Sequence, residues 1–309
     1  MKILLGLLFT LMASISMAKE TYTIVVASTP GNASDITIRS LADVYKRKTG
    51  NTLVIQNIGG GNQIPATVKF ANLNNPAIMT TTTSILVFNP VLQKNLPYSL
   101  DIFDHVGGIA LAPIVWVART DSPYRSMKDL VDVLPKSKKP LIGYATPVEV
   151  VNFQVISDKY NWKGVVDTVK YKGTPEVITG MLTGDMDVAV VSNSQVVEAQ
   201  IRANKIRLIG TTLSNPYTVG DQTAEPVENQ IKVKQFTGGI FLSLNKLFSA
   251  EAAAKLKADL FDAMKDPEFV QTMNKLGVVP FDNNNSNTNL IKFVDDFRNT
   301  IKQMNFETQ

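Results

Sequence analysis

Hydroxyl-bearing residues gather near the start of the chain, where a predicted strand gives way to a predicted helix. Ser28, Thr29 and Ser34 lie close together there and are followed by Asp35. The first amides of a helix lack intrahelical acceptors and its dipole favours negative charge, so this segment is suited to hold a carboxylate. We expect Asp35 to brace the segment, because its charge would repel a bound anion. The alternative is an ordinary turn in which Ser34 only caps the helix.

A second segment of this kind follows the predicted strand Leu141–Ala145. Thr146 stands three residues before Glu149. This spacing is typical of a capping box, in which the two residues satisfy each other's backbone amides, and it leaves ligand contact by Thr146 equally open. Polar residues after other predicted strands are expected to face a ligand-binding cleft together with these two segments. The predicted ligand-binding residues are Ser28, Thr29, Gly31, Asn32, Ala33, Ser34, Asp35, Thr83, Ser84, Ala145, Thr146, Ser192 and Asn193.

The chain lacks the residue patterns of catalysis. It has no Cys and a single histidine, His105, so a nucleophile–base pair would depend on that residue. It has no Gly-x-Ser-x-Gly elbow, no phosphate-binding loop and no cluster of His and Cys ligands. Asp185 and Asp187 would point to opposite faces of a strand and make a poor acid–base pair. We therefore expect a binding protein without catalytic residues, metal or cofactor; a secreted hydrolase that uses His105 is the alternative.

The elements around the first segment alternate between strand and helix. Ile38, Leu41 and Tyr45 recur on one face of a helix that Gly50 closes, since glycine suits the left-handed residue after a helix. This order is typical of a doubly wound sheet. The predicted elements are the strands Thr23–Ser28, Leu53–Gln56 and Ala77–Thr81 and the helices Ser34–Thr49 and Ser84–Leu92.

The segment Lys170–Thr212 repeats this alternation. Thr174 is placed to cap a helix, Gly184 to end it, and Asn193 or Ser194 to start the next. Such a run predicts a buried parallel sheet with a ligand crevice beyond the carboxyl ends of its strands. The other predicted elements are a β-rich region Phe103–Arg119, a helix Ser126–Leu134, a strand Asp187–Val191, a strand Ile206–Gly210, a loop Asn215–Asn229, a strand Ile240–Leu244 and three helices from near Ser249, Asp266 and Asn287.

Residues 1–18 are typical of a cleaved secretory signal peptide. Lys2 precedes the apolar run Ile3–Ile15, and Ala18 ends a short stretch suited to cleavage. No later segment approaches the roughly 20 apolar residues of a membrane span. We expect a free, soluble periplasmic protein, with an uncleaved N-terminal anchor as the alternative.

The composition is that of a globular protein with no strong charge bias. About 290 residues remain after cleavage, enough for roughly two domains, and 44% of the chain is hydrophobic. The formal net charge is +4, and the basic residues are scattered. Nucleic acid is therefore a poor candidate partner.

Short motifs recur along most of the chain in a definite order. Tyr171-Lys172-Gly173 and Gly184-Asp185-Met186-Asp187 are the most specific of them. Together the motifs resemble the solute receptors of tripartite tricarboxylate transporters, the Bug family. The others are Pro30, Gly31, Asp35 and Arg39; Asn57 and Gly59–Gly61; Asn89-Pro90; Leu96-Pro97-Tyr98; and Asp121-Ser122-Pro123.

The alternating modules and this resemblance imply a type II periplasmic binding protein fold, with two doubly wound α/β lobes joined by two crossing strands. We place lobe one at residues 19–116 and 240–309 and lobe two at 117–239. The crossings are expected along Ile114–Arg119 and Thr237–Leu244. A single large doubly wound domain is the alternative.

The resemblance also implies a function. A monomeric receptor would capture a small organic carboxylate between its lobes and deliver it to a tripartite tricarboxylate-type membrane permease. A dicarboxylate is favoured because each lobe offers a helix-terminus anion site. A nicotinate-like or amino-acid carboxylate, or a solute without a carboxylate, is the alternative. The family's usual signatures are absent around Asn74–Ala77, Thr146–Val150, Ala224–Glu228 and Leu244–Ser249, which leaves the ligand's identity open.

Overall fold

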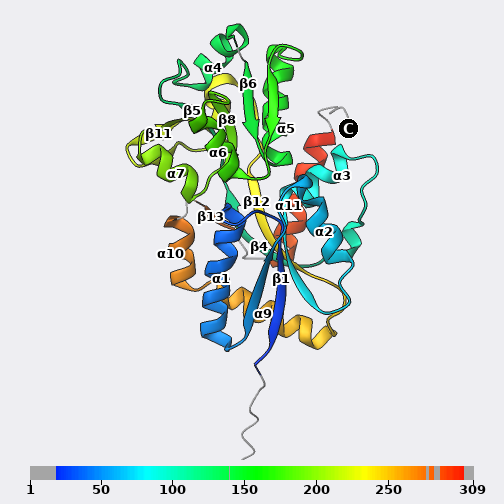
Figure 1. Cartoon of the computed structure of the whole chain (residues 1–309). Coiled ribbons are helices and arrows are strands. Elements are labelled where there is room, and N and C mark those ends of the chain that lie inside the picture. The colour runs from blue at the N-terminus through cyan, green and yellow to red at the C-terminus, as the bar shows by residue number, and fades with distance from the viewer. Residues whose placement is uncertain (1–18, 139, 276–277, 282–285, 303–309) are drawn as a thin grey trace, which may run out of the picture.

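Two α/β lobes stand one above the other, and each is built on its own sheet (Figure 1). The computed structural model describes residues 19–138, 140–275, 278–281 and 286–302. The predicted signal peptide, residues 1–18, lies outside the described residues, and so does the end of the predicted first lobe, residues 303–309. Within the described ranges, no helix combines the length and the apolar character needed to cross a membrane.

The sheet of lobe one is mixed: three neighbouring strands are parallel, and the other three make antiparallel pairs. Its strands are β1 (Thr21–Val26), β2 (Thr52–Asn57), β3 (Ala77–Thr82), β4 (Asp104–Ala112), β12 (Gly238–Leu244) and β13 (Val279–Pro280). Their order is β13-β4-β12-β3-β1-β2. β1 pairs in parallel with β2 and β3, whereas β12 runs antiparallel to β3 and β4. The parallel strands therefore end at one edge, which faces lobe two.

The sheet of lobe two repeats this plan. Its strands are β5 (Ile114–Arg119), β6 (Leu141–Tyr144), β7 (Asp167–Lys170), β8 (Val188–Ser192) and β9 (Ile206–Thr211), in the order β7-β6-β8-β5-β9. β6 pairs in parallel with β7 and β8, and β5 runs antiparallel to β8 and β9. The strands predicted within Lys170–Thr212 do run in one direction, but the parallel sheet predicted there is a mixed sheet, because β5 inserts between β8 and β9. In each lobe the antiparallel strand belongs to a part of the chain that has just crossed from the other lobe.

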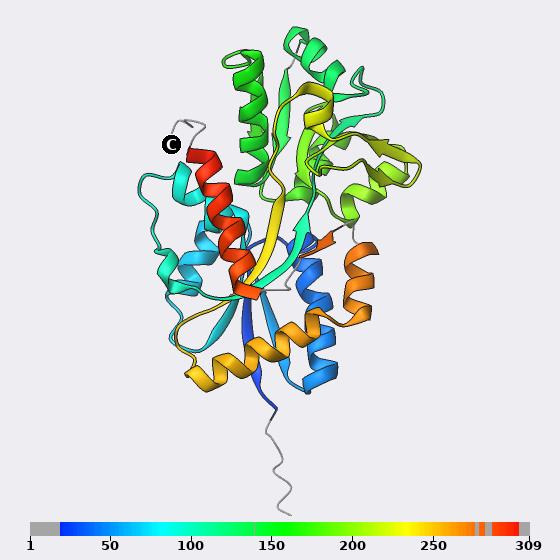
Figure 2. The ribbon, with the colours of Figure 1, turned by 180° about the vertical axis from the view of Figure 1, so that it is seen from behind.

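The change of sheet falls at Pro113, between β4 and β5. Ile114 already pairs with Ser192 in the second sheet, so the boundary predicted after residue 116 lies inside β5, and the first crossing does not run along Ile114–Arg119. The second crossing leads into β12, which pairs only within the first sheet and runs between the lobes in Figure 2.

Helices follow the parallel strands and begin near the edge that faces the other lobe (Figure 1). In lobe one these are α1 (Ala33–Thr49), η1 (Gly61–Gln63), α2 (Ile64–Ala71), the π-helical turn η2 (Ser84–Phe88) and α3 (Asn89–Leu92); in lobe two they are α5 (Pro147–Tyr160), α6 (Thr174–Thr183) and α7 (Gln195–Arg202). The remaining elements are η3 (Leu100–Ile102), α4 (Met127–Val133), η4 (Leu134–Lys136), β10 (Tyr217–Val219), β11 (Gln222–Ala224), α8 (Val227–Ile231), α9 (Ala250–Met264), α10 (Pro267–Lys275) and α11 (Ser286–Lys302).

Local sequence explains why α1 forms and where it stops. Asn32 caps its start by accepting a hydrogen bond from the amide of Ser34, so Ser34 is not the cap. Lys46, Arg47 and Lys48 lie in the last turn, where the helix dipole favours positive charge. Gly50 then ends the helix in the left-handed region, with φ at 77°, as predicted.

Other boundaries differ from the predicted ones by a residue or more. Gly173, not Thr174, is the N-cap of α6. Ser194, one of the two predicted starts, is the N-cap of α7. The segment 215–229, predicted as a loop, contains the hairpin β10–β11 and the start of α8. Short strands of three residues carry too little periodicity to be predicted from sequence.

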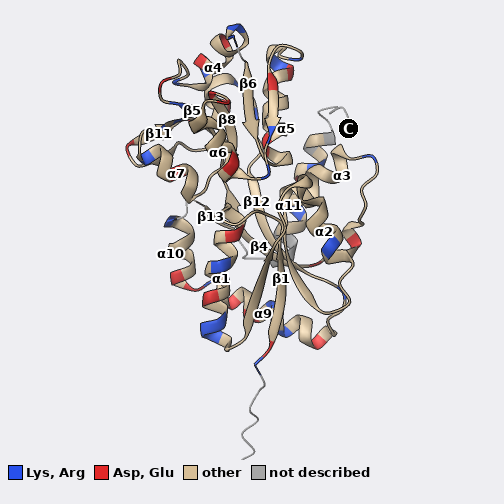
Figure 3. Cartoon of the chain, in the orientation of Figure 1, with Lys and Arg blue, Asp and Glu red and all other residues tan. Residues whose placement is uncertain are grey.

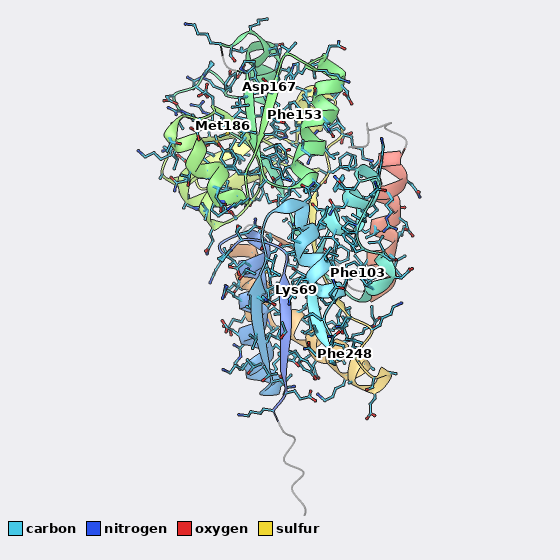
Figure 4. The ribbon with its side chains drawn as sticks, turned by 45° about the vertical axis from the view of Figure 1, so that its right-hand side comes forward. Lys69, Phe103, Phe153, Asp167, Met186 and Phe248 are labelled. Carbon is cyan, nitrogen blue, oxygen red and sulfur yellow. The ribbon has the colours of Figure 1, made fainter. Side chains whose placement is uncertain are left out.

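A continuous apolar core joins the two lobes on one side of the sheets. Its members include Phe103 of the first lobe and Phe153 of the second, both labelled in Figure 4. Phe88 of η2 packs edge-on against Phe236 of the returning chain, with ring centroids 5.9 Å apart. The opposite faces of the two sheets pack into separate clusters. The lobes are thus attached along one side, which leaves their facing loops to form a cleft on the other.

Candidate functional site

Two small cavities lie between the lobes, lined by loops that follow the parallel strands of both sheets. The inner cavity of about 30 Å³ is lined by Ser34 and Thr83 of lobe one and by Thr146 of lobe two, among others. The adjoining cavity of about 10 Å³ is lined by Ser28, Thr146 and Lys172, among others. Each has room for only a water molecule or two, so the lobes are drawn close together.

In lobe one, Asp35 organises the loop between β1 and α1. Its carboxylate accepts hydrogen bonds from the amide of Gly31 and from the side chains of Arg39 and Asn57, and Arg39 lies 2.9 Å from its Oδ1. Burial alone would raise the pKa of Asp35, but these donors outweigh burial and hold it below its ordinary value. Asp35 therefore braces the loop, as predicted, and it does not line either cavity.

Thr29 lies where the loops of the two lobes meet. A Cβ built on Gly59 would stand 2.5 Å from Cγ2 of Thr29, and one on Gly173 of lobe two would stand 2.3 Å from its Oγ1. Only glycine permits so close an approach at these positions. The hydroxyl of Thr29 is buried without a hydrogen-bond partner, but it points into this contact and not into the cavities.

The segment after β2 forms an unusual turn beside the cavities. Four consecutive residues, Gly60, Gly61, Asn62 and Gln63, have φ values of 82°, 56°, 55° and 68°. For residues other than glycine, this left-handed conformation costs about 1–2 kcal/mol each. Gly60, Asn62 and Gln63 all line the smaller cavity. Backbone strain of this kind concentrates at ligand sites, where the surrounding structure maintains it.

In lobe two, Glu149 lies at the start of α5 and is completely buried. It accepts hydrogen bonds from the amides of Ala145 and Thr146 at 2.7 and 2.9 Å, and from the amide and hydroxyl of Ser192 at 2.7 and 2.8 Å. Burial raises the pKa of Glu149, and these donors oppose the rise. Since all four partners are donors, the geometry is that of an ionised carboxylate.

Glu149 therefore occupies the anion site that the start of α5 would offer to a ligand. The amides of Thr146 and Ser192, two predicted site residues, are directed at Glu149. Thr146 and Glu149 stand in the capping-box arrangement predicted for the start of α5, while the hydroxyl of Thr146 makes no full hydrogen bond within the chain and lies on the cavity wall. The loop thus acts as a cap through Glu149, while the side chain of Thr146 is open to a ligand.

Lys172 is the only charged residue among the described residues that line these two cavities. It follows β7, and sequence reasoning placed it in a motif without a binding role. Two nearby carboxylates are already matched by donors, Asp35 by Arg39 and Asn57 and Glu149 by amides. A third, that of Glu176, lies beside Gly173 with its Oε2 buried and unpartnered, and it lines neither cavity. The cleft therefore favours an anion over a cation or a neutral solute. Elsewhere Lys and Arg alternate with Asp and Glu over both lobes (Figure 3).

The structure brings most of the predicted ligand-binding residues to the cavity walls. Those that line them are Ser28, Asn32, Ala33, Ser34, Thr83, Ser84, Ala145, Thr146 and Ser192. The remaining four do not: Thr29 fills the lobe contact, Gly31 and Asp35 hold each other, and Asn193 donates to Glu198 and Tyr217. The other lining residues lie outside the predicted set: Ala27, Gly60, Asn62, Gln63, Thr82, Ala112, Pro147, Val148, Lys172, Gly238, Gly239 and Ile240.

His105 lies far along β4 from this cleft. It stands near the start of the strand, whereas Ala112 at the strand's end lines the inner cavity. Its Nδ1 is 2.9 Å from Oγ of Ser243, but Ser243 is completely buried and also bonds Thr81. Burial lowers the pKa of His105. This pair belongs to the packing of the first sheet and offers no exposed nucleophile. The described residues contain no cluster of metal-ligating side chains.

Comparison with known proteins places this geometry in a family. Residues 37–306 match the family model described as "Tripartite tricarboxylate transporter family receptor". This match covers most of the chain, from within α1 onward.

Solved structures share the fold over nearly the whole chain. The periplasmic binding protein BugD is 21% identical with a TM-score of 0.82, covering 94% of this chain and 99% of that one. Rpa4515 of R. palustris, solved with adipate, is 16% identical with a TM-score of 0.81 over 93% and 96% of the chains. MatC of Rhodopseudomonas palustris, with bound malate, is 17% identical with a TM-score of 0.80 over 91% and 97%. At these identities the likeness shows the two-lobe periplasmic binding protein fold alone.

Proposed function

The chain belongs to the tripartite tricarboxylate transporter family of receptors, which are solute-binding proteins, and from this premise we propose that it captures a small organic carboxylate, with a dicarboxylate favoured. The solute is held between the two lobes and delivered to a membrane permease of the tripartite type. Two structural neighbours were solved with dicarboxylates, adipate and malate, which supports this ligand class. The receptor works in the periplasm after removal of residues 1–18, as a monomer.

One observation carries the proposal: the cavities between the lobes combine a single lysine with unpartnered hydroxyls. Lys172, the hydroxyl of Ser28 and the hydroxyl of Thr146 line the smaller cavity together. A carboxylate would supply the acceptors that these donors lack and would neutralise the lysine. Buried hydroxyls without partners are costly, so their presence at a cavity favours a polar ligand.

A thermal-shift screen of mono-, di- and tricarboxylates tests the ligand class. A carboxylate present at about 100 times its dissociation constant should add roughly 2.7 kcal/mol of apparent stability and raise the melting temperature. A nicotinate-like or amino-acid carboxylate belongs in the same screen. If a neutral solute raises the melting temperature and no carboxylate does, the proposal is wrong.

Replacing Thr146 with Val tests the cleft assignment. The hydroxyl makes no full hydrogen bond within the chain and contributes only to the capping box of α5, so its loss should lower the free energy of unfolding by no more than about 1 kcal/mol. Affinity for the carboxylate should fall several-fold, since one neutral hydrogen bond contributes about 1 kcal/mol. Equal affinity in calorimetry for both proteins would remove Thr146 from the site.

A further inference from the structure

A third cavity, of about 80 Å³, opens beside the two inner ones. Its walls come from both lobes and include Asn62 of the left-handed turn and Tyr144, Gln154 and Lys170 of lobe two. It shares Asn62 and Pro147 with the smaller inner cavity, so the three cavities lie next to one another. By the same measure it is the roomiest of the three and has space for several water molecules or a carboxylate with neighbouring methylenes.

Lys170 carries the only charge on the walls of this third cavity among the described residues. It is the last residue of β7 and pairs in register with Tyr144 of β6, which places both side chains on one face of the sheet. Figure 4 shows Asp167, at the other end of β7, high in lobe two, so the strand runs toward the cleft and delivers Lys170 there.

The ammonium group of Lys170 has no counter-charge in the part of the chain that is described. Its hydrogen bond goes to the side-chain oxygen of Asn62, across the cleft, and no described carboxylate lies within 4.0 Å. Partial removal from water lowers the pKa of Lys170. A cation held in this way gains most from an anion that enters the cavity.

Two further groups beside Lys170 can serve an anion. Burial raises the pKa of Tyr144, so its hydroxyl stays protonated and can donate. The side-chain oxygen of Gln154 is buried without a partner, and a rotation of that amide by half a turn presents its NH₂ group to a ligand instead. An ammonium, a phenol and a carboxamide thus meet at one cavity.

Because Glu149 occupies the start of α5, a dicarboxylate needs a second group of donors elsewhere in lobe two. The start of α5 was the expected anion site of lobe two, but the carboxylate of Glu149 takes its amides. A ligand carboxylate placed there would meet a buried negative charge. If one end of the ligand lies at Lys172, the other must reach a different donor set.

We propose that Lys170, with Tyr144 and Gln154, forms a second anion subsite that receives the far carboxylate of a dicarboxylate solute. The assignment rests on the proposed function and names the residue that separates dicarboxylates from monocarboxylates. Lys172 then anchors the end that every carboxylate ligand shares, and Lys170 reads the second charge.

Calorimetric titration of the full chain with chain-length-matched pairs tests the subsite, starting with adipate and hexanoate and extending to succinate and butyrate. The wild type should bind the dicarboxylate at least about 10-fold more tightly than its partner, the range for a hydrogen-bonded charge. Lys170→Met should remove that preference and leave the monocarboxylate affinity unchanged. Lys170→Arg should keep part of the preference.

Lys69→Met is the matched control, because Lys69 is an exposed lysine of α2 that lines none of the three cavities. Unfolding without ligand should be the same for all variants. If Lys170→Met weakens both members of a pair equally, Lys170 only closes the lobes through Asn62 and the subsite is wrong. Unchanged binding of both members also overturns it. If the wild type binds no carboxylate in the series, the proposed function fails and the subsite with it.

Discussion

Each lobe places a carboxylate at the start of the helix that follows its central parallel strand, and the two carboxylates are satisfied differently. Asp35 of α1 is held largely by side chains, those of Arg39 and Asn57, and takes one amide. Glu149 of α5 is held by three backbone amides and the hydroxyl of Ser192. Asp35 therefore leaves most amides of its loop to other partners, whereas Glu149 accepts hydrogen bonds from the amides at the start of α5.

Because of this difference, the two lobes offer different groups to a ligand. In lobe one the loop itself remains suited to a ligand carboxylate, with Ser28 and Ser34 on the cavity walls. In lobe two the charge for a ligand must come from Lys170, the last residue of β7, and from Lys172, which follows that strand. A fold with near-repeating lobes can thus hold one solute by two different chemistries.

Glu149→Ala should have the largest effect on stability. It leaves buried donors without an acceptor, so we expect the free energy of unfolding to fall by about 2–4 kcal/mol. Asp35→Ala should cost only about 1 kcal/mol, because the side chain of Arg39 is 52% exposed and can turn to water. Urea denaturation of both variants measures the contrast, with Glu149→Gln as the conservative control. Equal losses would mean that the two carboxylates play the same structural role.

Gly173→Ala tests how closely the two lobes must approach. The new methyl would stand 2.3 Å from Oγ1 of Thr29, whereas the backbone at Gly173, with φ at −167°, suits any residue. The closed form should be disfavoured by about 1–3 kcal/mol, which weakens carboxylate binding about 10-fold or more in calorimetry.

The double variant Thr29→Ala with Gly173→Ala is the matched control for that substitution. It removes Oγ1. The contacts that remain are an ordinary one of 3.5 Å to the Cβ of residue 29 and one of 3.1 Å to Oε2 of Glu176, the far end of a flexible side chain. Affinity should return toward that of Thr29→Ala alone. A double variant that binds as weakly as Gly173→Ala would show that the clash is not the cause.

Lys172→Met should weaken mono- and dicarboxylates alike, by about 10-fold, since it removes the one charge on the walls of the smaller inner cavity among the described residues. Calorimetric titration measures both ligand classes. Lys172→Met should lower the affinity for both ligand classes equally, whereas Lys170→Met should lower the affinity for dicarboxylates alone. A selective effect of Lys172→Met would exchange the roles of the two lysines.

Acid should change the contributions of Asp35 and Glu149 to the free energy of unfolding in opposite directions. This is the smallest of the expected effects. The pKa of Asp35 is lowered in the folded state, so its stabilisation is present above about pH 4 and is lost as the pH falls further. The pKa of Glu149 is raised, so its contribution is complete below about pH 4 and is lost as the pH rises through the raised value.

Unfolding measured between about pH 7 and pH 3 checks these signs. The stability difference between wild type and Asp35→Asn should shrink on acidification, and that between wild type and Glu149→Gln should grow. If both stability differences shrank, or both grew, on acidification, the opposite pKa shifts assigned to Asp35 and Glu149 would be wrong.

Much of the fold was predictable because its signals are local. The helix of Ile38 and Leu41 with its Gly50 terminus, and the strand–helix alternation after Lys170, follow from periodicity and capping within a few residues. The insertion of β5 between β8 and β9 was not predictable, because strand pairing depends on partners distant in the chain.

The candidate site likewise contains residues that the sequence predicted and residues that it did not. Polar residues that follow strands were identifiable, since the carboxyl ends of parallel strands meet at one edge. The left-handed turn of Asn62 and Gln63 and the positions of Lys170 and Lys172 depend on how two loops of different lobes meet. A lysine after a strand is usually solvated, and nothing nearby in the sequence marks it as a ligand contact.

The sequence by itself determined the alternating elements, the family and the presence of hydroxyls and a carboxylate at each helix start. Only the tertiary structure decided which donors each carboxylate takes, and therefore which amides and lysines remain for a solute. The physical reason is that hydrogen bonds are exclusive and short-ranged. Whether the amide of Ser192 serves Glu149 or a ligand depends on the packing of α5 against β8, two elements that the chain joins only through folding.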